Sequence, residues 1–194
     1  MANEFYALLG RMRYITRWGL MRNSFSENIQ EHSHQVAVLA HALALIRRDI
    51  LGLEAPDPDR CAVAALYHDA SETLTGDMPT PIKYYNSSMR NAYKQVETIA
   101  NNRLLALLPS QLTAAYKPYL LEEDPAIEGI VKAADKLAAY IKCVEELKAG
   151  NLEFETAAGQ ILSALQEMQR EELAWFLSEC MPAFMQNLDE LGIM

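Results

Sequence analysis

Apolar residues recur three or four positions apart along most of the chain, which is the spacing of one face of an α-helix. Phe5, Leu8, Leu9 and Met12 show this spacing at the start and predict a short first helix. The same pattern predicts longer helices over residues 31–48, 58–69, 88–107, 124–149, 153–169 and 171–190. Because no alternating β-branched run bounded by turns interrupts it, we expect an all-α fold.

Two segments break the helical pattern. Residues 13–30 are irregular, and Trp18-Gly19 interrupts any periodicity there. Residues 76–81 contain two prolines within three positions, which a regular helix cannot accommodate. We find no internal repeat, low-complexity stretch or linker, so the sequence predicts one domain over residues 1–194.

Composition excludes several classes of protein. Hydrophobic residues make up 51% of the 194 positions, which is too many for a disordered chain. No run of about 18 apolar residues is present and the N-terminus lacks the build of a signal peptide, so we expect no membrane span. The net charge of −9 argues against a nucleic-acid polymer as the main partner. The three cysteines form no CxxC pair, which fits a reducing cytoplasm.

A basic stretch lies near the start of the chain. Residues 11–22 carry no acidic residue and four arginines, which are Arg11, Arg13, Arg17 and Arg22. The stretch is short enough to form a local clamp for an anion. For each individual arginine, a solvated or salt-bridged position is an equally good interpretation.

His68-Asp69 is the most informative polar feature. The pair ends a predicted helix, directly after the apolar residues 62–67. Burying an unpaired carboxylate is very costly, so a buried His-Asp pair needs a partner, and a divalent cation is the natural one. His32 precedes the pair by 36 residues and Asp135 follows it by 66. Two imidazoles and two carboxylates form a mixed site that suits Co, Mn, Ni, Zn, Fe or Mg better than Ca.

Helix geometry separates the histidines. Successive helix residues are about 100° apart, so His32 shares a face with Val36 and Leu43. It therefore points toward the core, either as a metal ligand or as a buried, hydrogen-bonded histidine. His34 and His41 share a different face, so we expect them to be structural or surface residues. This arrangement favours one metal ion over a dinuclear site.

Two more acidic residues are candidates for chemistry. Asp135 lies among alanines that leave room for close packing, which favours a metal ligand over an exposed Asp paired with Lys132 or Lys136. Glu72 follows His68 by four residues, so the two share a face if the helix continues. A carboxylate beside the metal is expected to act as a general acid or base. The alternative is an exposed Glu in the next turn.

The motifs occur in a defined order: Arg17-Trp18, Glu31-His32-Ser33, residues 67–72 (YHDASE), residues 75–83 (TGDMPTPIK), Ala134-Asp135 and residues 143–151 (CVEELKAGN). This ordered set resembles the HD-domain metal-dependent phosphohydrolases, and within them the bacterial 5′-deoxynucleotidases. The resemblance spans nearly the whole chain. It implies a compact helical HD-domain bundle.

The resemblance also implies an activity. Enzymes of this branch hydrolyse deoxyribonucleoside 5′-monophosphates to the deoxynucleoside and phosphate. Arg17 would orient the substrate phosphate, which its planar guanidinium suits, and Glu72 would assist proton transfer. One divalent metal ion would be held by His32, His68, Asp69 and Asp135.

A second set of residues would recognise the sugar. Trp18 would lie against the deoxyribose and crowd out a ribose 2′-OH, while packing on the core beside the first helix is its alternative role. Asp77 would accept a hydrogen bond from the 3′-OH. The implied substrate pocket consists of Arg17, Trp18, His32, Asp77, Met78, Pro79, Thr80 and Asp135. The resemblance and the apolar pattern of the last two helices favour a homodimer, for which an intramolecular core is the alternative explanation of that pattern.

Other functions stay open on the sequence alone. Deoxynucleoside triphosphohydrolases of this fold look larger, with extra basic residues for the triphosphate. Cyclic-di-nucleotide hydrolases carry a Gly-Tyr-Pro motif after the HD pair, and this chain has none. A non-catalytic nucleotide sensor that keeps the metal site is a different class. Intact Glu72 and Arg17 argue against a sensor, because a sensor need not retain both.

Overall fold

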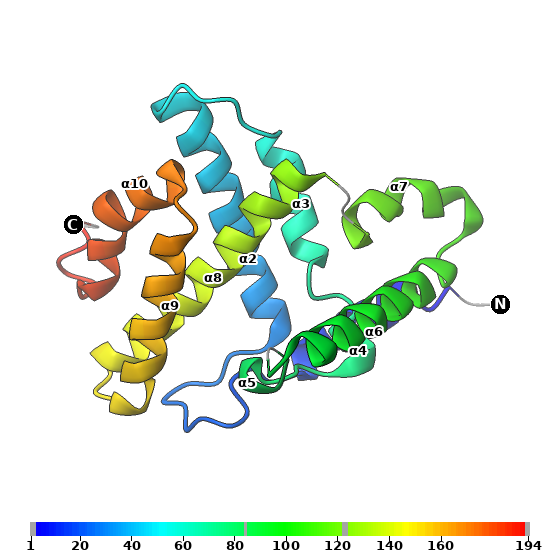
Figure 1. The fold of residues 1–194 in the computed structure, drawn as a ribbon, viewed down its shortest axis with the longest axis horizontal. Helices are drawn as coiled ribbons and strands as arrows, with labels where there is room; N and C mark the ends of the chain where they lie inside the picture. The colour runs from blue at the N-terminus through cyan, green and yellow to red at the C-terminus, as the bar shows by residue number, and fades with distance from the viewer. Residues whose placement is uncertain (1–2, 84, 122–123, 193–194) are drawn as a thin grey trace.

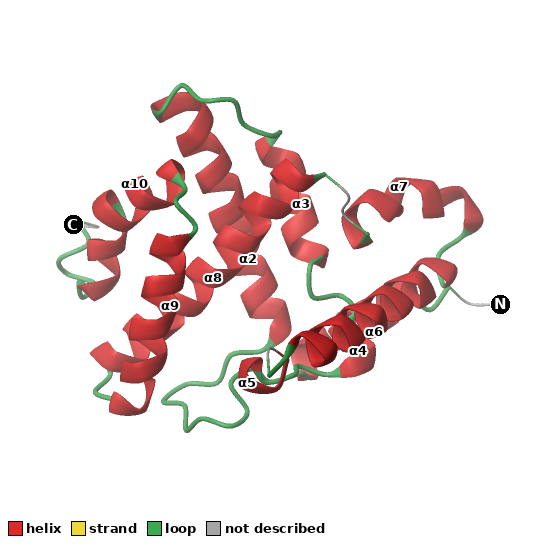
Figure 2. Cartoon of the chain, in the orientation of Figure 1, coloured by secondary structure: helices red, strands yellow, loops and turns green. Residues whose placement is uncertain are grey.

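The computed structural model describes residues 3–83, 85–121 and 124–192, and its helices and loops there include no β-strand (Figure 2). The α-helices are α1 (Phe5–Leu9), α2 (Ile29–Leu45), α3 (Pro58–Tyr67), α4 (Glu72–Thr75), α5 (Thr80–Lys83), α6 (Ser87–Ala106), α7 (Ser110–Leu120), α8 (Pro125–Lys148), α9 (Glu155–Glu167) and α10 (Glu171–Glu179). Short 3₁₀ segments cover Gly10–Tyr14, Leu152–Phe154 and Met181–Met185, and Ile46–Ile50 is π-helical. The all-α prediction is confirmed. No helix in these ranges is long and apolar enough to cross a membrane.

Two long helices, α2 and α8, cross at the centre of the fold, and α3 packs against both (Figure 1). Small side chains such as Ala40, Ala65 and Ala134 are fully buried at these contacts, which lets the helices approach closely. Leu43 and Leu137 fill the remaining space. Burying one such leucine side chain stabilises the fold by roughly 1.5–3 kcal/mol. Residues of α9 and α10 cover one side of this core.

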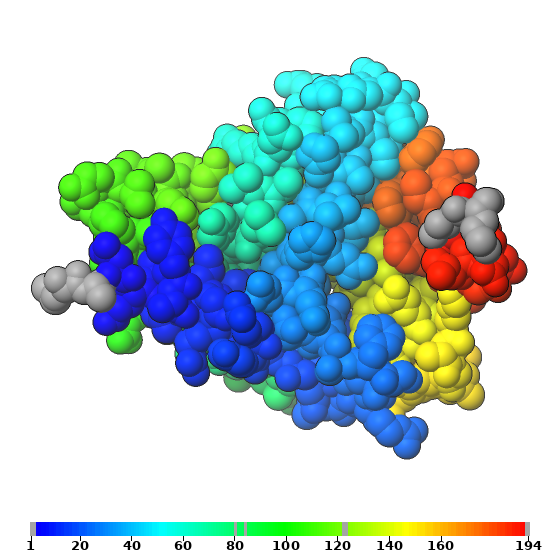
Figure 3. Space-filling model, turned by 180° about the vertical axis from the view of Figure 1, so that it is seen from behind, coloured from blue at the N-terminus to red at the C-terminus, as the bar shows by residue number. Residues whose placement is uncertain are grey.

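A smaller apolar cluster lies at the other end of the molecule, between α1, α6 and α7. Phe5 and Leu104 are fully buried there, and Leu120 nearly so. Seen from behind, the N-terminal segment lies at this end and the C-terminal elements lie at the opposite end (Figure 3). Ala70 belongs to the same cluster. The turn that follows α3 is therefore anchored between the two apolar regions.

Side-chain caps define where the three central helices begin. Asn28 accepts hydrogen bonds from two backbone N–H groups of α2 and forms a capping box with Glu31. Asp57 caps α3 and Asp124 caps α8, and each is followed by a proline at the start of its helix. A cap of this kind stabilises a helix by about 1 kcal/mol. The cap of α2 also fixes the position of His32, which lies in the first turn.

The helix α7 is a correction to the sequence analysis, which predicts no element over residues 110–120. The helix contains Pro118, a residue that normally interrupts helices because it lacks a backbone N–H. Here the proline lies in the last turn, and Tyr116 and Leu120 pack against the cluster around Phe5. Tertiary packing therefore outweighs the lost backbone hydrogen bond.

Two predicted helix ends are also wrong. The predicted 171–190 helix ends at Glu179, and the chain continues as a short 3₁₀ segment that contains Pro182. The predicted 58–69 helix ends at Tyr67. As a result His68 and Asp69 lie in a turn, where their side chains face inward toward α2 and α8.

Candidate active site

Three of the four predicted metal ligands converge, and the fourth, Asp69, lies beside the two histidines. His32 lies in the first turn of α2, His68 and Asp69 in the turn after α3, and Asp135 in α8. One ligand atom each from His32, His68 and Asp135 lies within 4.8 Å of the other two. Asp69 Oδ2 lies 3.2 Å from His68 Nε2 and 3.7 Å from His32 Nε2. The result is a mixed nitrogen and oxygen cluster where the central helices meet.

The hydrogen bonds around His68 fit a metal-binding imidazole. Its Nδ1 lies 2.7 Å from the carbonyl oxygen of Ala65, which can only accept, so Nδ1 carries the proton. In the neutral imidazole the lone pair of Nε2 would then face the cluster, and Nε2 is buried without a hydrogen-bond partner. A carbonyl that orients the far ring nitrogen is the usual support for a histidine ligand. The donor set therefore fits a divalent cation.

The charges in the cluster are strongly coupled. Burial opposes the charged form of His68, but Asp69 and Asp135 raise its pKa to about 9. Burial also opposes ionisation of both carboxyls. Contacts with His68, His32 and Arg17 nevertheless hold the pKa of Asp69 well below its usual range, and the His32 hydrogen bond lowers that of Asp135 to about 2. Both carboxylates are thus ionised at neutral pH, while His68 must lose a proton before it can bind a cation.

Glu72 lies at the start of α4. It is near enough for the charge of Asp69 to act on it, but it does not belong to the group of converging ligand atoms. It is only 5% exposed, which excludes the alternative of a surface Glu, and its Oε2 has no hydrogen-bond partner. Burial, together with the charges of Asp69 and Asp77, raises the pKa of Glu72 to about 9. A carboxyl whose pKa is raised in this way suits the donation of a proton. The helix does not continue from His68, so Glu72 reaches the site through a turn.

Arg17 is the member of the basic stretch that enters the cluster. Its Nη1 lies 3.6 Å from Asp69 Oδ2, and its side chain is only 13% exposed. Burial opposes its charge, but Asp135, Asp69 and Glu27 raise its pKa above the ordinary value. Arg11, Arg13 and Arg22 are exposed, as expected for a solvated face.

Trp18 and Glu27 form a contact that the sequence analysis did not anticipate. Trp18 Nε1 donates to Glu27 Oε2 at 3.1 Å, and the same oxygen accepts from Arg17 Nε at 3.0 Å. The Trp18 ring lies 5.3 Å from the Phe154 ring, in a cluster with Cys143 of α8. Trp18 therefore packs on the core, as its alternative role requires, but it does so beside α8 and α9 and not beside the first helix. The sequence does not indicate a role for Glu27, because the residue lies in an irregular segment without a periodic pattern.

The remaining predicted pocket residues lie between α4 and α5. Asp77, Met78 and Pro79 are partly buried. Burial raises the pKa of Asp77 while Arg17 opposes the rise, which puts Asp77 within electrostatic reach of the cluster. Thr80 begins α5, and its side chain lies outside the described part of the structure.

Residues that the sequence analysis keeps out of the metal site also lie apart from it. His34 is exposed, and His41 Nε2 lies 3.3 Å from Asp59 Oδ1. Lys132 binds Glu128 at 2.6 Å, so the alternative pairing of Lys132 with Asp135 does not form.

Comparison with known proteins assigns the chain to a family. The model of the 5′-deoxynucleotidase YfbR-like family matches residues 4–184. The chain belongs to this family. It is 47% identical over 192 residues to a 5′-deoxynucleotidase of Erwinia tasmaniensis, covering 98% of this chain and 96% of the relative. It is 48% identical to a 5′-deoxynucleotidase of Vibrio cholerae, covering 98% of each.

Solved structures show the same fold as this YfbR-like chain. An HD-domain phosphohydrolase from Listeria innocua has a TM-score of 0.79 at 23% identity, over 95% of this chain and 90% of that one. An HD phosphohydrolase of cyanophage S-2L, bound to dA and one catalytic Zn²⁺ ion, has a TM-score of 0.62 at 19% identity, over 87% and 91%. The predicted HD-domain bundle and the predicted family are both confirmed.

Proposed function

We propose that this protein is a 5′-deoxynucleotidase that hydrolyses deoxyribonucleoside 5′-monophosphates to the deoxynucleoside and phosphate. The observation that carries the proposal is one site that combines metal-type donors with Arg17 and a buried Glu72. Identity of 47–48% to 5′-deoxynucleotidases over nearly the whole chain supports the same reaction.

His32, His68, Asp69 and Asp135 would hold one divalent metal ion. When bound, such an ion activates water and neutralises charge on the phosphate. The cyanophage neighbour with its catalytic Zn²⁺ supports zinc as one candidate. The nitrogen and oxygen donors suit Co, Mn, Ni, Fe and Mg as well, so metal identity depends on affinity order and on availability.

Arg17 and Glu72 would act on the two ends of the phosphoester. Arg17 is held by Glu27 through Nε, so the guanidinium orients its other nitrogens toward the cluster, where they can bind phosphate oxygens. In the reaction, a water oxygen bonds to phosphorus and the bond from phosphorus to the 5′-oxygen breaks. Glu72 would supply the proton that the leaving 5′-oxygen takes up.

The sugar would be selected by residues beside Arg17 and by the segment between α4 and α5. Trp18 would lie against the deoxyribose and exclude a 2′-OH, and Asp77 would accept a hydrogen bond from the 3′-OH. Met78, Pro79 and Thr80 would line this part of the pocket. The dA bound to the cyanophage neighbour supports a deoxynucleoside as the recognised group.

Product analysis separates this function from the alternatives. We expect inorganic phosphate from dAMP after the metal is supplied. Tripolyphosphate from dATP, with no hydrolysis of dAMP, would indicate a triphosphohydrolase instead. Of the four arginines in the basic stretch, Arg17 alone reaches the cluster. One arginine suits a substrate with one phosphate group better than a triphosphate. Nucleotide binding without any product over a long incubation would indicate a sensor.

Three further predictions come from the sequence, and the homodimer among them draws on the family resemblance. These are one domain over residues 1–194, a homodimer and a cytoplasmic location. The apolar residues of the last two helices give little support to the dimer, because Leu165, Leu173 and Phe176 are buried within the chain's own core. Light scattering on the purified protein would measure the oligomeric state directly, and a monomer mass would contradict the dimer.

A further inference from the structure

Glu27 is a buried carboxylate that binds two neighbouring site residues through one oxygen atom. Its Oε2 lies 3.0 Å from Arg17 Nε and 3.1 Å from Trp18 Nε1, and the residue is 8% exposed. Consecutive residues in an extended chain point to opposite sides. Here Trp18 has a φ of +58°, a left-handed conformation that is uncommon for a non-glycine residue. The chain thus bends at Trp18, and both side chains reach the same acceptor.

The backbone holds Glu27 opposite Arg17 independently of these side-chain contacts. The Arg17 N–H donates to the Glu27 carbonyl at 2.9 Å, and Ile29 donates to Ile15 at 3.0 Å. Thr16 and Asn28 form an antiparallel bridge between them. Glu27 is therefore fixed at the base of the loop 18–26, immediately before the capped start of α2.

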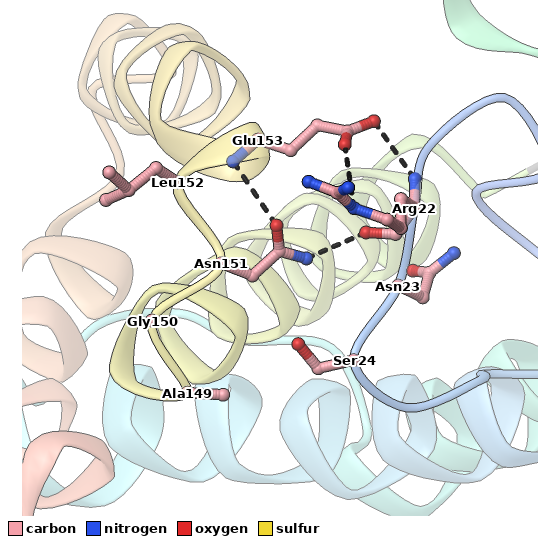
Figure 4. Close-up of a pocket in the computed structure, with 8 residues that line it drawn as sticks. All are labelled: Arg22, Asn23, Ser24, Ala149, Gly150, Asn151, Leu152 and Glu153. Carbon is pink, nitrogen blue, oxygen red and sulfur yellow. Dashed lines mark hydrogen bonds and ion pairs between the residues drawn. The ribbon is translucent and has the colours of Figure 1, made fainter.

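Other residues hold the loop itself, away from Arg17. The Arg22 backbone N–H donates to Glu153 at 3.0 Å, and Asn151 donates to the Arg22 carbonyl at 2.7 Å (Figure 4). Ser24 N–H donates to Glu146 of α8 at 2.9 Å. These contacts place the loop and touch neither functional side chain. Arg17 also pairs with Asp69, and the Trp18 ring also packs on Phe154, but Glu27 binds both side chains and so links their positions.

We propose that Glu27 is a positioning residue that couples phosphate binding by Arg17 to sugar selection by Trp18. This inference rests on the function proposed above. Because one oxygen serves both donors, a shift of the Glu27 carboxylate moves the guanidinium and the indole together. Glu27 itself need not touch the substrate. Its removal should therefore weaken catalysis and sugar discrimination at once, which removal of Arg17 or Trp18 alone would not do.

Activity on a matched pair of substrates tests the coupling. In Glu27→Ala we expect kcat/KM for dAMP to fall by about tenfold or more, the size of one lost charge-assisted hydrogen bond. We also expect the preference for dAMP over AMP to shrink. Glu27→Gln keeps one carbonyl acceptor and should be intermediate. Glu31→Gln removes a charge four residues away but keeps an acceptor for the Asn28 N–H, so the cap of α2 and His32 stay in place and the preference should not change.

A double-mutant comparison separates coupling from general damage. If Glu27 acts on selectivity through Trp18, then adding Glu27→Ala to Trp18→Ala should cause no further change in the dAMP to AMP ratio. An equal fall of both activities in Glu27→Ala, with the ratio unchanged, would overturn the proposal. So would a ratio that changes by the same factor with and without Trp18.

Fluorescence gives a readout that does not depend on activity. The chain has two tryptophans, so a Trp175→Phe background leaves Trp18 as the sole indole. Acrylamide quenching of Trp18 should rise in Glu27→Ala and stay constant in Glu31→Gln; no rise would overturn the proposal. If the unmodified enzyme fails to prefer dAMP over AMP, the proposed function fails, and quenching alone then decides whether Glu27 positions Trp18. If Glu27→Ala does not fold, Glu27→Gln replaces it in the measurement of the dAMP to AMP ratio and in the quenching of Trp18.

Discussion

Glu146 and Lys142 form a buried ion pair on α8, directly beneath the loop that follows Trp18. Their side chains are 0% and 2% exposed, respectively. Both carboxylate oxygens of Glu146 accept hydrogen bonds, one from Lys142 and the other from Asn151, and Ser24 N–H donates to both. Replacing Glu146 by glutamine keeps the shape of the side chain while removing its charge. Whichever way the amide turns, its NH₂ group faces a donor.

The expected loss of stability is large because the remaining charge stays buried. Removing one partner of a buried pair costs about 3–5 kcal/mol, since the other charge is left uncompensated. For a chain of this length, each kcal/mol corresponds to a shift in Tm of roughly 2–4 °C. We therefore expect Glu146→Gln to melt about 6–20 °C below the unmodified protein.

The same helix offers a matched control. Glu128 and Lys132 are also four residues apart and paired, but their side chains are 45% and 65% exposed. An exposed helical pair contributes about 0.5 kcal/mol or less, so Glu128→Gln should shift Tm by at most about 2 °C. Both variants are compared by calorimetry or by circular dichroism at pH 7. Equal shifts for the two variants would refute the reasoning from burial.

The pH dependence provides an independent check of the sign. Burial opposes ionisation of Glu146, but hydrogen bonds from Lys142, Asn151 and Ser24 lower its pKa to about 2. In the unfolded chain a Glu titrates near about 4.3. The stabilisation is thus fully present above that value and is lost as the pH falls toward 2. The Tm difference between the unmodified protein and Glu146→Gln should be constant from pH 7 to about 5 and shrink at pH 3. A difference that grows on acidification would contradict this assignment.

Three changes at the site test the proposed roles. Glu72→Ala should lower kcat by roughly 10²–10⁴-fold while dAMP binding, measured by calorimetry, stays close to normal; near-normal turnover would remove Glu72 from the mechanism. Trp18→Ala should raise activity on AMP relative to dAMP, and an unchanged ratio in a folded variant would sink the role of Trp18 as a 2′-OH filter. Asp135→Asn should weaken divalent metal binding by about tenfold or more, whereas Asp59→Asn, which faces His41 outside the cluster, should not. Equal metal affinity in the two Asp variants would argue against Asp135 as a ligand.

The candidate site could be predicted to the extent that helix geometry determines where side chains point. His32 and Asp135 lie on helices that form as expected, so their positions toward the core follow from the 3.6-residue period. The sequence predicts a helix that includes His68 and Asp69. The two residues lie in a turn instead, yet they still reach the cluster. The HD pair is informative because polar residues after a buried apolar run need a partner, whatever the local backbone.

The sequence does not predict features that depend on contacts between residues distant in the chain. Nothing local marks Glu27, because its role comes from a bend at Trp18 and from pairing across the loop. The sequence does not predict helix α7, because Pro118 argues against a helix and the packing that offsets it comes from α1 and α6. The high pKa of Glu72 likewise arises from its burial beside Asp69 and Asp77, which sequence spacing cannot reveal.

Phosphate release from dAMP and AMP, after chelation and re-addition of single divalent metals, tests the central claim most directly. The account predicts no release from the chelated protein. It also predicts that one or more of Co, Mn, Ni, Zn, Fe and Mg restores release from dAMP, with little from AMP. Equal release from both nucleotides would contradict the sugar selectivity. No release from either, with metal demonstrably bound, would contradict the proposed 5′-deoxynucleotidase activity itself.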